Sequence, residues 1–363
     1  MSQKIDIHDL YLNYNPEAPQ IRFKAAGLTA ALVEKASDRL PSAIPWPAGK
    51  APAAAPLAHA PADTEDLTKF QGYDAVVVTW TAAEAATLAS LFTPGYKTSD
   101  WYLYRHNVAA YIPLVTGSQA PFNDHQPDMA RCYHTLGLYF PCKIGNARAL
   151  VVKSGLHLDY DGPATPVRKL MDEIATAVKP KIFITTGTGG GIGAEVALGD
   201  VVIAGQTRFD CVTQFKSEPW KSATYNPTPV PAKALQAITP ALTSVNAAKV
   251  PGARPHPTIW SASTDAIVTT DFFGFDDSTN YYQLQGLGRA CDMGDAMVGQ
   301  ALQGHAGLKW FAIRNASDPQ MPNPNHDIEA AKKAAGDIYS KYGAFTTAAS
   351  VIATWAVIDA IIN

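Results

Sequence analysis

The segment "KIFITTGTGGGIGAEVALGDVVIAG", residues 181–205, decides the fold of this chain. A β-rich run leads into a cluster of glycines, and a second apolar run follows almost at once. Bare backbone of this kind permits either a tight turn between strands or the close approach of a ligand. We favour the ligand, with the hydroxyl group of Thr188 beside it.

Part of this segment also matches the sequence motif of a dinucleotide-binding site. Residues 189–194 read GGGIGA, which satisfies the pattern G-x-G-x-x-A. A dinucleotide site needs a helix directly after the glycines, so that the helix N-terminus faces the pyrophosphate. Here Gly199 and Asp200 follow too soon to leave room for such a helix, and "DVVIAG" is typical of another strand. We therefore reject a dinucleotide site and predict no redox cofactor.

The composition is that of a globular protein. The chain has 363 residues, of which 47% are hydrophobic and 17% charged, and its formal net charge is −3. This suits a soluble protein of one large or two smaller domains. The small negative charge gives no electrostatic reason to expect nucleic acid or an anionic membrane as a partner.

Cysteine and histidine patterns exclude two further classes of site. The four cysteines are widely spaced and form no C-x-x-C pair, so we expect reduced thiols in a cytoplasmic protein. The nine histidines show no metal-ligand spacing, and we predict no metal.

The apolar C-terminal stretch, residues 342–363, is long enough to raise the question of a membrane span. It contains several threonines and Asp359, and it lacks flanking basic anchors. We predict a buried helix.

Strands and helices alternate after residue 70. The predicted strands are 74–80, 149–155, 181–187, 200–210, 258–263 and 309–318, and the predicted helices are 82–92, 164–178, 291–306 and 326–362. This order predicts an α/β fold with a mixed, mostly parallel central sheet flanked by helices. Before it we expect an N-terminal extension (1–40, with a helix near 25–40) and a Pro/Ala-rich linker or strap (41–70), so that the α/β domain spans 71–363.

Four segments together resemble one family. They are "DAVVVTWTAAEAATL", "ITTGTGGGIGAEVALGDVVIA", "CDMGDAMVGQAL" and "WFAIRNASDPQ", in this order. The chain is similar here to the nucleoside phosphorylase and purine nucleosidase superfamily, including methylthioadenosine/adenosylhomocysteine nucleosidases. The resemblance covers roughly residues 70–363. It implies a nucleoside phosphorylase-like fold, cleavage of the N-glycosidic bond of a small-molecule nucleoside, no cofactor, and a homo-oligomer.

The resemblance implies two catalytic residues. Asp318 matches the acid that protonates the leaving base, and for this task burial must raise its pKa. Glu84 matches the glutamate with which the hydrolytic branch activates water. Glu84 is also the only charged residue between Ala75 and Tyr96, which favours a deliberately placed carboxylate. Thr188, with Gly189 and Gly190, is expected to line the reaction centre.

A phosphorylase is the first alternative, with inorganic phosphate as co-substrate. The phosphorolytic branch commonly has an arginine just before the glycine turn, where this chain has Thr185 and Thr186. An uncharged site binds phosphate poorly, so this departure favours water. A substitute set of phosphate ligands stays open: Arg105, His106, His157 and Arg208.

The sugar and base contacts depart further from the family. The family helix offers a glutamate directly after the methionine, but Met293 is followed here by Gly294. We expect Met293, with Asp292 or Asp295, to bind the sugar.

The positions where the family has a purine-stacking aromatic residue are Ile267 and Val268. The backbone of Val268 could read the ring edge, and Phe272 or Phe273 could supply a stacking face worth ~1 kcal/mol. These departures keep alive a second alternative, a nucleoside-binding or storage protein without turnover.

Overall fold

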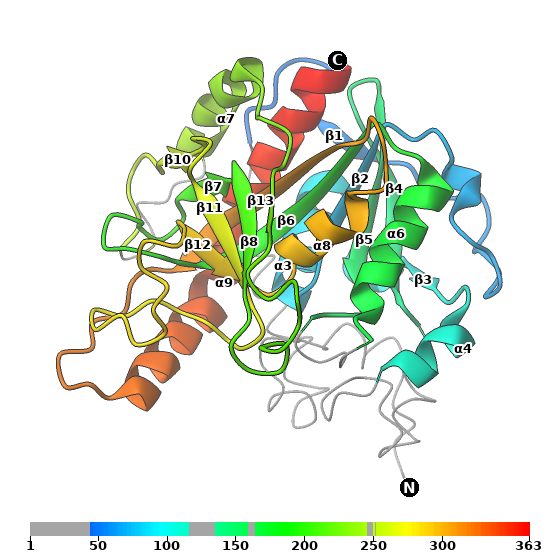
Figure 1. The fold of residues 1–363 in the computed structure, drawn as a ribbon. Helices are drawn as coiled ribbons and strands as arrows, with labels where there is room; N and C mark the ends of the chain where they lie inside the picture. The colour runs from blue at the N-terminus through cyan, green and yellow to red at the C-terminus, as the bar shows by residue number, and fades with distance from the viewer. Residues whose placement is uncertain (1–43, 116–134, 159–163, 245–249, 251) are drawn as a thin grey trace, which may run out of the picture.

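The computed structural model describes residues 44–115, 135–158, 164–244, 250 and 252–363. The helix predicted near residues 25–40 lies outside these residues. Within them, a 13-stranded sheet forms the centre and helices cover both of its faces (Figure 1). The strands are β1 (Pro52–Ala54), β2 (Ala75–Thr79), β3 (Tyr102–Tyr104), β4 (Gly137–Ile144), β5 (Ala147–Ser154), β6 (Ile182–Gly191), β7 (Val201–Ile203), β8 (Gln206–Asp210), β9 (Thr224–Tyr225), β10 (Ile259–Trp260), β11 (Ala266–Thr270), β12 (Ala290–Asp292) and β13 (Lys309–Asp318).

The helices form two layers. They are α3 (Ala82–Phe92), α4 (Val108–Tyr111), α6 (Pro166–Val178), α7 (Ala232–Ser244), α8 (Asp295–Leu302) and α9 (Ile328–Ile362), with short 3-10 turns η2 (Thr68–Phe70), η3 (Thr98–Asp100) and η4 (Ile112–Leu114). Helix α9 packs against α3 and α7 as well as β6 and β13. Helices α6 and α8 pack against each other on the other side of the sheet (Figure 1).

The sheet has two parallel halves. Strands β5, β2, β6 and β13 run parallel to one another, and so do β8, β11 and β12. The halves meet where β12 pairs antiparallel with β6, and β7 adds an antiparallel contact to β13. The predicted fold class, a mixed and mostly parallel sheet flanked by helices, is confirmed. Parallel pairing brings the ends of β2, β6 and β13 to one edge of the sheet.

The glycines up to Gly191 lie in a strand and do not form the tight turn that was the alternative to a ligand site. Strand β6 continues through Gly191, and the chain turns only after it. Strand β12 lies so close that a Cβ atom on Gly189 would be 2.8 Å from the Cys291 carbonyl oxygen. Glycine is therefore needed for the close approach of a strand. The predicted strand 200–210 is also wrong as one element, because β7 and β8 divide it and pair with different strands.

The C-terminal segment forms the long helix α9. Among the described residues, Phe345–Ile362 is the one stretch that is long and apolar enough to cross a membrane, and 78% of it is buried inside the fold. This burial is what was predicted for it from its polar side chains.

The described part of the strap lies against the domain. Strand β1 pairs antiparallel with β4. The Trp355 indole donates a hydrogen bond to the Lys50 carbonyl at 2.8 Å, and the Lys50 ammonium pairs with Asp359 at 2.8 Å. The division of the chain at residues 40 and 70 stays a prediction.

Candidate active site

A small cavity lies where β6, β12 and β13 come together. Its volume is about 20 Å³, room for one water molecule. Six residues expected at the site from the sequence line it: Thr188, Gly189, Gly190, Asp292, Met293 and Asp318. Four further residues, which were not expected from the sequence, also line it: Gly274, Cys291, Ser317 and Tyr339.

Asp318, the last residue of β13, has a free oxygen at this cavity. Its Oδ1 accepts a hydrogen bond from the Ser317 hydroxyl at 2.9 Å. Its Oδ2 is buried and has no hydrogen-bond partner among the described residues. Burial raises the pKa of Asp318 to about 7, against a smaller opposing effect of the Ser317 bond. At neutral pH a large share of this carboxyl group is therefore protonated and able to donate its proton.

Glu84 is fixed by the first turn of α3. It forms a capping box with Thr81: the Glu84 N–H donates to the Thr81 hydroxyl at 3.2 Å, and Oε2 accepts from the Thr81 N–H at 2.9 Å. Oε2 also accepts from the Thr79 hydroxyl (2.7 Å) and the Trp80 N–H (3.0 Å). The T-x-x-E spacing in the sequence is the signal for this geometry.

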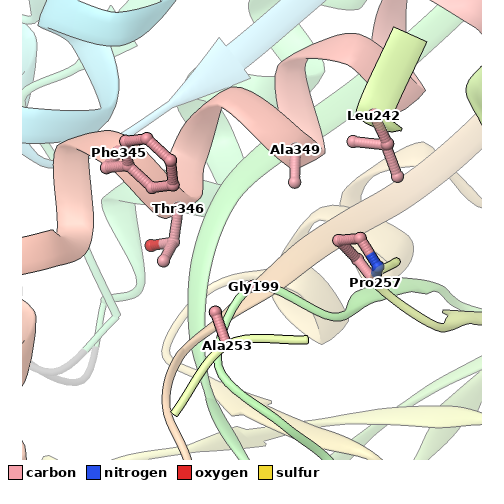
Figure 2. Close-up of a pocket in the computed structure, with 7 residues that line it drawn as sticks. All are labelled: Gly199, Leu242, Ala253, Pro257, Phe345, Thr346 and Ala349. Carbon is pink, nitrogen blue, oxygen red and sulfur yellow. The ribbon is translucent and has the colours of Figure 1, made fainter. Parts of the chain in front are cut away.

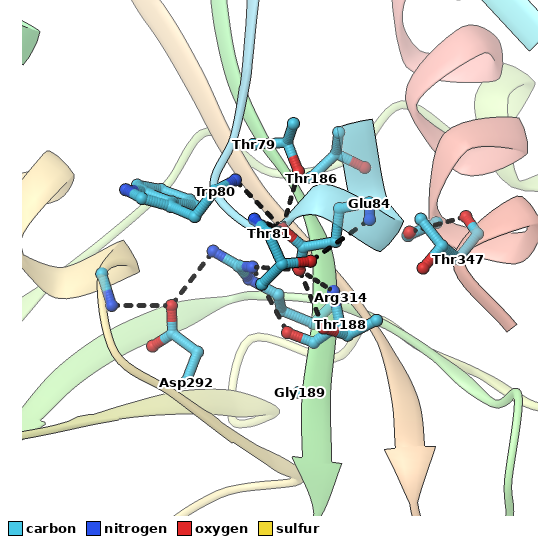
Figure 3. Close-up of polar contacts among 12 residues, drawn as sticks. Thr79, Trp80, Thr81, Glu84, Thr186, Thr188, Gly189, Asp292, Arg314 and Thr347 are labelled. Carbon is cyan, nitrogen blue, oxygen red and sulfur yellow. Dashed lines mark hydrogen bonds and ion pairs between the residues drawn. The ribbon is translucent and has the colours of Figure 1, made fainter. Parts of the chain in front are cut away.

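The other Glu84 oxygen reaches the glycine strand. Oε1 accepts from the Thr188 N–H at 2.6 Å and from its hydroxyl at 2.8 Å (Figure 3). Burial opposes ionisation of Glu84, but the nearby Arg314 and the hydrogen bonds outweigh it and lower the pKa. Glu84 is thus an anion with five hydrogen-bond donors, and Thr188 stands between it and the cavity.

Arg314, in the middle of β13, was missed in the sequence. Its guanidinium group binds both oxygens of Asp295, at 2.6 and 2.8 Å. It also lies 3.1 Å from Asp292 Oδ2 and 3.6 Å from Glu84 Oε1, beneath the Trp80 ring at 4.9 Å (Figure 3). A charged residue inside the apolar run "WFAIRNAS" was the available signal, the same one that drew attention to Glu84.

The two aspartates expected at the sugar lie in different surroundings. Asp295 is fully buried under Arg314 and does not line the cavity. Asp292 lines it. Burial and the neighbouring Asp295 raise the pKa of Asp292 to about 7, although Arg314 and Thr269 act in the opposite direction.

Only one of the residues expected to contact the base lines the cavity. Ile267 and Val268 are completely buried in β11, and neither lines the cavity. Phe273 does line it. Phe272 instead packs against Tyr282, with ring centroids 4.9 Å apart.

The candidate phosphate ligands do not line the cavity. Arg105 pairs with Asp63 at 2.9 Å, and His106 contacts the Thr64 carbonyl at 2.9 Å. His157 lies edge-on to Trp80, and Arg208 is in β8. Within the described part of the chain, no lysine, arginine or histidine lines the cavity.

Two other cavities have linings that are less suited to catalysis. Figure 2 shows the mostly apolar residues that line a cavity between α7 and α9. The volume of this cavity is about 10 Å³, and we regard it as a packing void. An open groove of about 470 Å³ runs beside α6. Its carboxylates Asp172 and Glu173 already bind His305 (2.7 Å) and Tyr111 (2.6 Å).

Comparisons with known proteins agree with this fold. The sequence profile described as "Phosphorylase superfamily" matches residues 114–344, more than half of the chain. A 5′-methylthioadenosine/S-adenosylhomocysteine nucleosidase from Colwellia psychrerythraea, solved with adenine, has a TM-score of 0.50 and 14% identity, over 80% of this chain and 96% of its own. Futalosine hydrolase of Helicobacter pylori has a TM-score of 0.49 and 12% identity, over 80% and 98%. No curated protein matches the sequence significantly. The chain belongs to the phosphorylase superfamily, whose members are enzymes that act on glycosidic bonds.

Proposed function

We propose that this enzyme hydrolyses the N-glycosidic bond of a purine-type nucleoside. The observation that carries the proposal is the free, buried Oδ2 of Asp318 at the cavity, on a carboxyl group whose pKa is raised to about 7. The leaving base takes up a proton as the bond breaks, and an acid with a pKa near the working pH supplies it best. Asp318 would protonate a ring nitrogen of the base.

Water is the better candidate for the second reactant. Phosphate needs cations or several donors around it, and the described cavity wall presents no basic side chain. Arg314 is nearby, but Asp295 holds it by two hydrogen bonds. The cavity already has room for one water molecule.

Thr188 would connect this water to Glu84. The Thr188 hydroxyl donates to Glu84 Oε1, which leaves its own oxygen able to accept a proton from water in the cavity. The low pKa of Glu84 makes it a weak base. A weak base is sufficient when the sugar is already oxocarbenium-like, because the water then attacks before it loses its proton.

A nucleoside is much larger than the present cavity. Binding must therefore move some of the side chains that line it, and Tyr339, Met293 and Phe273 are the large ones. Phe273 would then supply the stacking face for the base. The proposal involves no cofactor. Assembly into a homo-oligomer and a cytoplasmic location remain predictions.

The test is release of free base from a panel of purine nucleosides, including 5′-thio-substituted ones, with and without phosphate. Release without phosphate, lost in Asp318→Asn and retained in the exposed control Glu195→Gln, would support hydrolysis. Release only with phosphate would establish a phosphorylase instead. Binding by calorimetry without any base release would indicate a nucleoside-binding protein.

A further inference from the structure

The free oxygen of Asp318 shares its surroundings with the Cys291 thiol group. A Cβ atom on Gly190 would lie 3.0 Å from Cys291 Sγ and 3.2 Å from Asp318 Oδ2. The Gly274 carbonyl oxygen is 3.5 Å from the same position. All four residues line the cavity. The sulfur atom and the carboxyl oxygen therefore border the same small space next to β6.

The thiol group directs its proton to the backbone. Cys291 Sγ donates to the Gly274 carbonyl oxygen at 3.2 Å, and the Gly190 carbonyl oxygen is a second acceptor at 3.5 Å. Since a thiol has a single proton, none is left for Asp318, whose Oδ2 has no hydrogen-bond partner among the described residues. Burial, followed by the nearby Asp318, raises the pKa of the Cys291 thiol well above its ordinary value, so the thiol stays neutral.

A neutral sulfur atom at this place favours the protonated form of Asp318. The sulfur narrows a cavity of about 20 Å³, in which one water molecule at most has room beside Oδ2. Sulfur is also a weak acceptor, so it binds a proton on Oδ2 only weakly. A stronger donor in its place would instead stabilise the carboxylate and lower the pKa of Asp318.

The other titratable groups around Asp318 have different partners. From α9, the Tyr339 hydroxyl donates to the hydroxyl group that caps α3, at 2.9 Å. From β12, Asp292 accepts from backbone N–H groups and faces Arg314. From the loop after β11, Asp276 accepts from a backbone N–H and two glutamine side chains. From β6, the residues that line the cavity are uncharged. The thiol is thus the neighbour best placed to act on Oδ2.

We propose that Cys291 is a positioning residue for the acid: its thiol stands beside Asp318 Oδ2, gives its own proton to the backbone, and so leaves the carboxyl proton for the leaving base. This rests on the proposed function, in which Asp318 protonates that base. The carbonyl groups of Gly190 and Gly274 hold the thiol in this orientation. Cys291 itself exchanges no proton with the substrate.

Replacing the thiol by a hydroxyl group tests this role. A hydroxyl is a stronger donor than a thiol, and a carboxylate is a stronger acceptor than a backbone carbonyl, so in Cys291→Ser the hydroxyl should turn to Oδ2. The upper limb of kcat/KM should then move down by about one pH unit or more. The share of the low-pH rate that remains at pH 8 should be about tenfold smaller than in the wild type.

The matched control is the same exchange at another buried cysteine. Cys142 lies in β4, and its thiol is also free. Cys142→Ser should leave the upper limb in place, although it too puts a hydroxyl group into the interior. An unchanged limb in Cys291→Ser would overturn the inference.

The carboxyl carbon of Asp318 reports the same effect without turnover. In ligand-free protein labelled with carbon-13 at the aspartate carboxyl groups, the NMR signal of Asp318 is identified by its loss in Asp318→Asn. We expect it to titrate with a pKa of about 7 in the wild type and at least about one unit lower in Cys291→Ser. Equal midpoints would overturn the inference even in an active enzyme. A lowered midpoint in a protein that releases no base would support it although the hydrolase proposal had failed.

A second variant serves if Cys291→Ser does not fold. Cys291→Ala removes the sulfur and makes room for a further water molecule, which can donate to Oδ2. We expect the NMR midpoint of Asp318 to fall in this variant as well. A purely structural role would lower the stability in urea without moving the midpoint, and that result would overturn the inference.

Discussion

Arg314 and Asp295 form a bidentate ion pair that lies wholly inside the protein. The guanidinium Nε and one terminal nitrogen each bind a different carboxylate oxygen, at 2.8 and 2.6 Å. Asp292 and Glu84 approach the same cation, so one buried positive group serves three carboxylates. Arg314 therefore fixes these three carboxylates next to the site, although it does not line the cavity.

Removing this cation should destabilise the whole fold. Arg314→Met leaves three carboxylates buried around an apolar side chain, and we expect a loss of about 3–5 kcal/mol in the free energy of unfolding. Urea unfolding followed by circular dichroism measures it. Arg168→Met, on the exposed face of α6, is the matched control and should change little. A loss below about 1 kcal/mol for Arg314→Met would mean that the carboxylates are protonated rather than paired.

The activity should depend on the protonated form of Asp318. Because the pKa of this group is about 7, kcat/KM should be constant below pH 6 and fall about tenfold per pH unit above pH 8. Asp318→Asn should lower activity by about 10² to 10⁴ and remove this dependence. Activity that rises steadily from pH 6 to pH 9 would contradict the assignment.

The stability of the fold should respond to the same proton. The pKa of Asp318 is raised from its ordinary 3.8 to about 7, so the folded state holds a proton that the unfolded state releases. The stabilisation is complete below about pH 4 and lost as the pH rises to about 7. Relative to Asp318→Asn, the wild-type protein should lose at most roughly 4 kcal/mol over this interval. Asp337→Asn, an exposed aspartate on α9, should show no such trend.

The hydroxyl group of Thr188 should matter more than its size. Thr188→Val keeps the shape but breaks the link between the cavity and Glu84, and kcat should fall about 100-fold or more. Thr188→Ser keeps the hydroxyl and should stay within about fivefold of wild type. Similar losses in both variants would argue for packing rather than proton transfer, because Thr188→Ser keeps the hydroxyl group and removes only the methyl group.

Much of the fold was predictable because local sequence patterns determine it. Alternating strand and helix patterns gave the sheet and its covering layers, and the isolated charge of Glu84 in an apolar run gave a buried carboxylate. The path of β6 through its glycines was not predictable, because it depends on β12 crossing from a hundred residues away in the sequence. Arg314 was predictable in the same way as Glu84, because it is a charged residue inside an apolar run.

The site was predicted unevenly for a similar reason. Asp318 is the last residue of β13 and Thr188 lies near the end of β6, and parallel strands bring such ends together. Ile267 and Val268 lie on β11, which β12 separates from β6, and their place depends on the register between β8, β11 and β12. Register across three strands is set by packing that a single sequence does not display.

The strap has a consequence for the behaviour of the protein outside the active site. Strand β4 has β5 on one side, and on the other side it has only the short strands β1 and β3. Without β1, the hydrogen-bonding groups of residues 142–144 would face solvent in an extended conformation. Such an exposed edge pairs readily with strands of other molecules. By pairing with residues 142–144, β1 covers an edge on which strands of other molecules could otherwise pair.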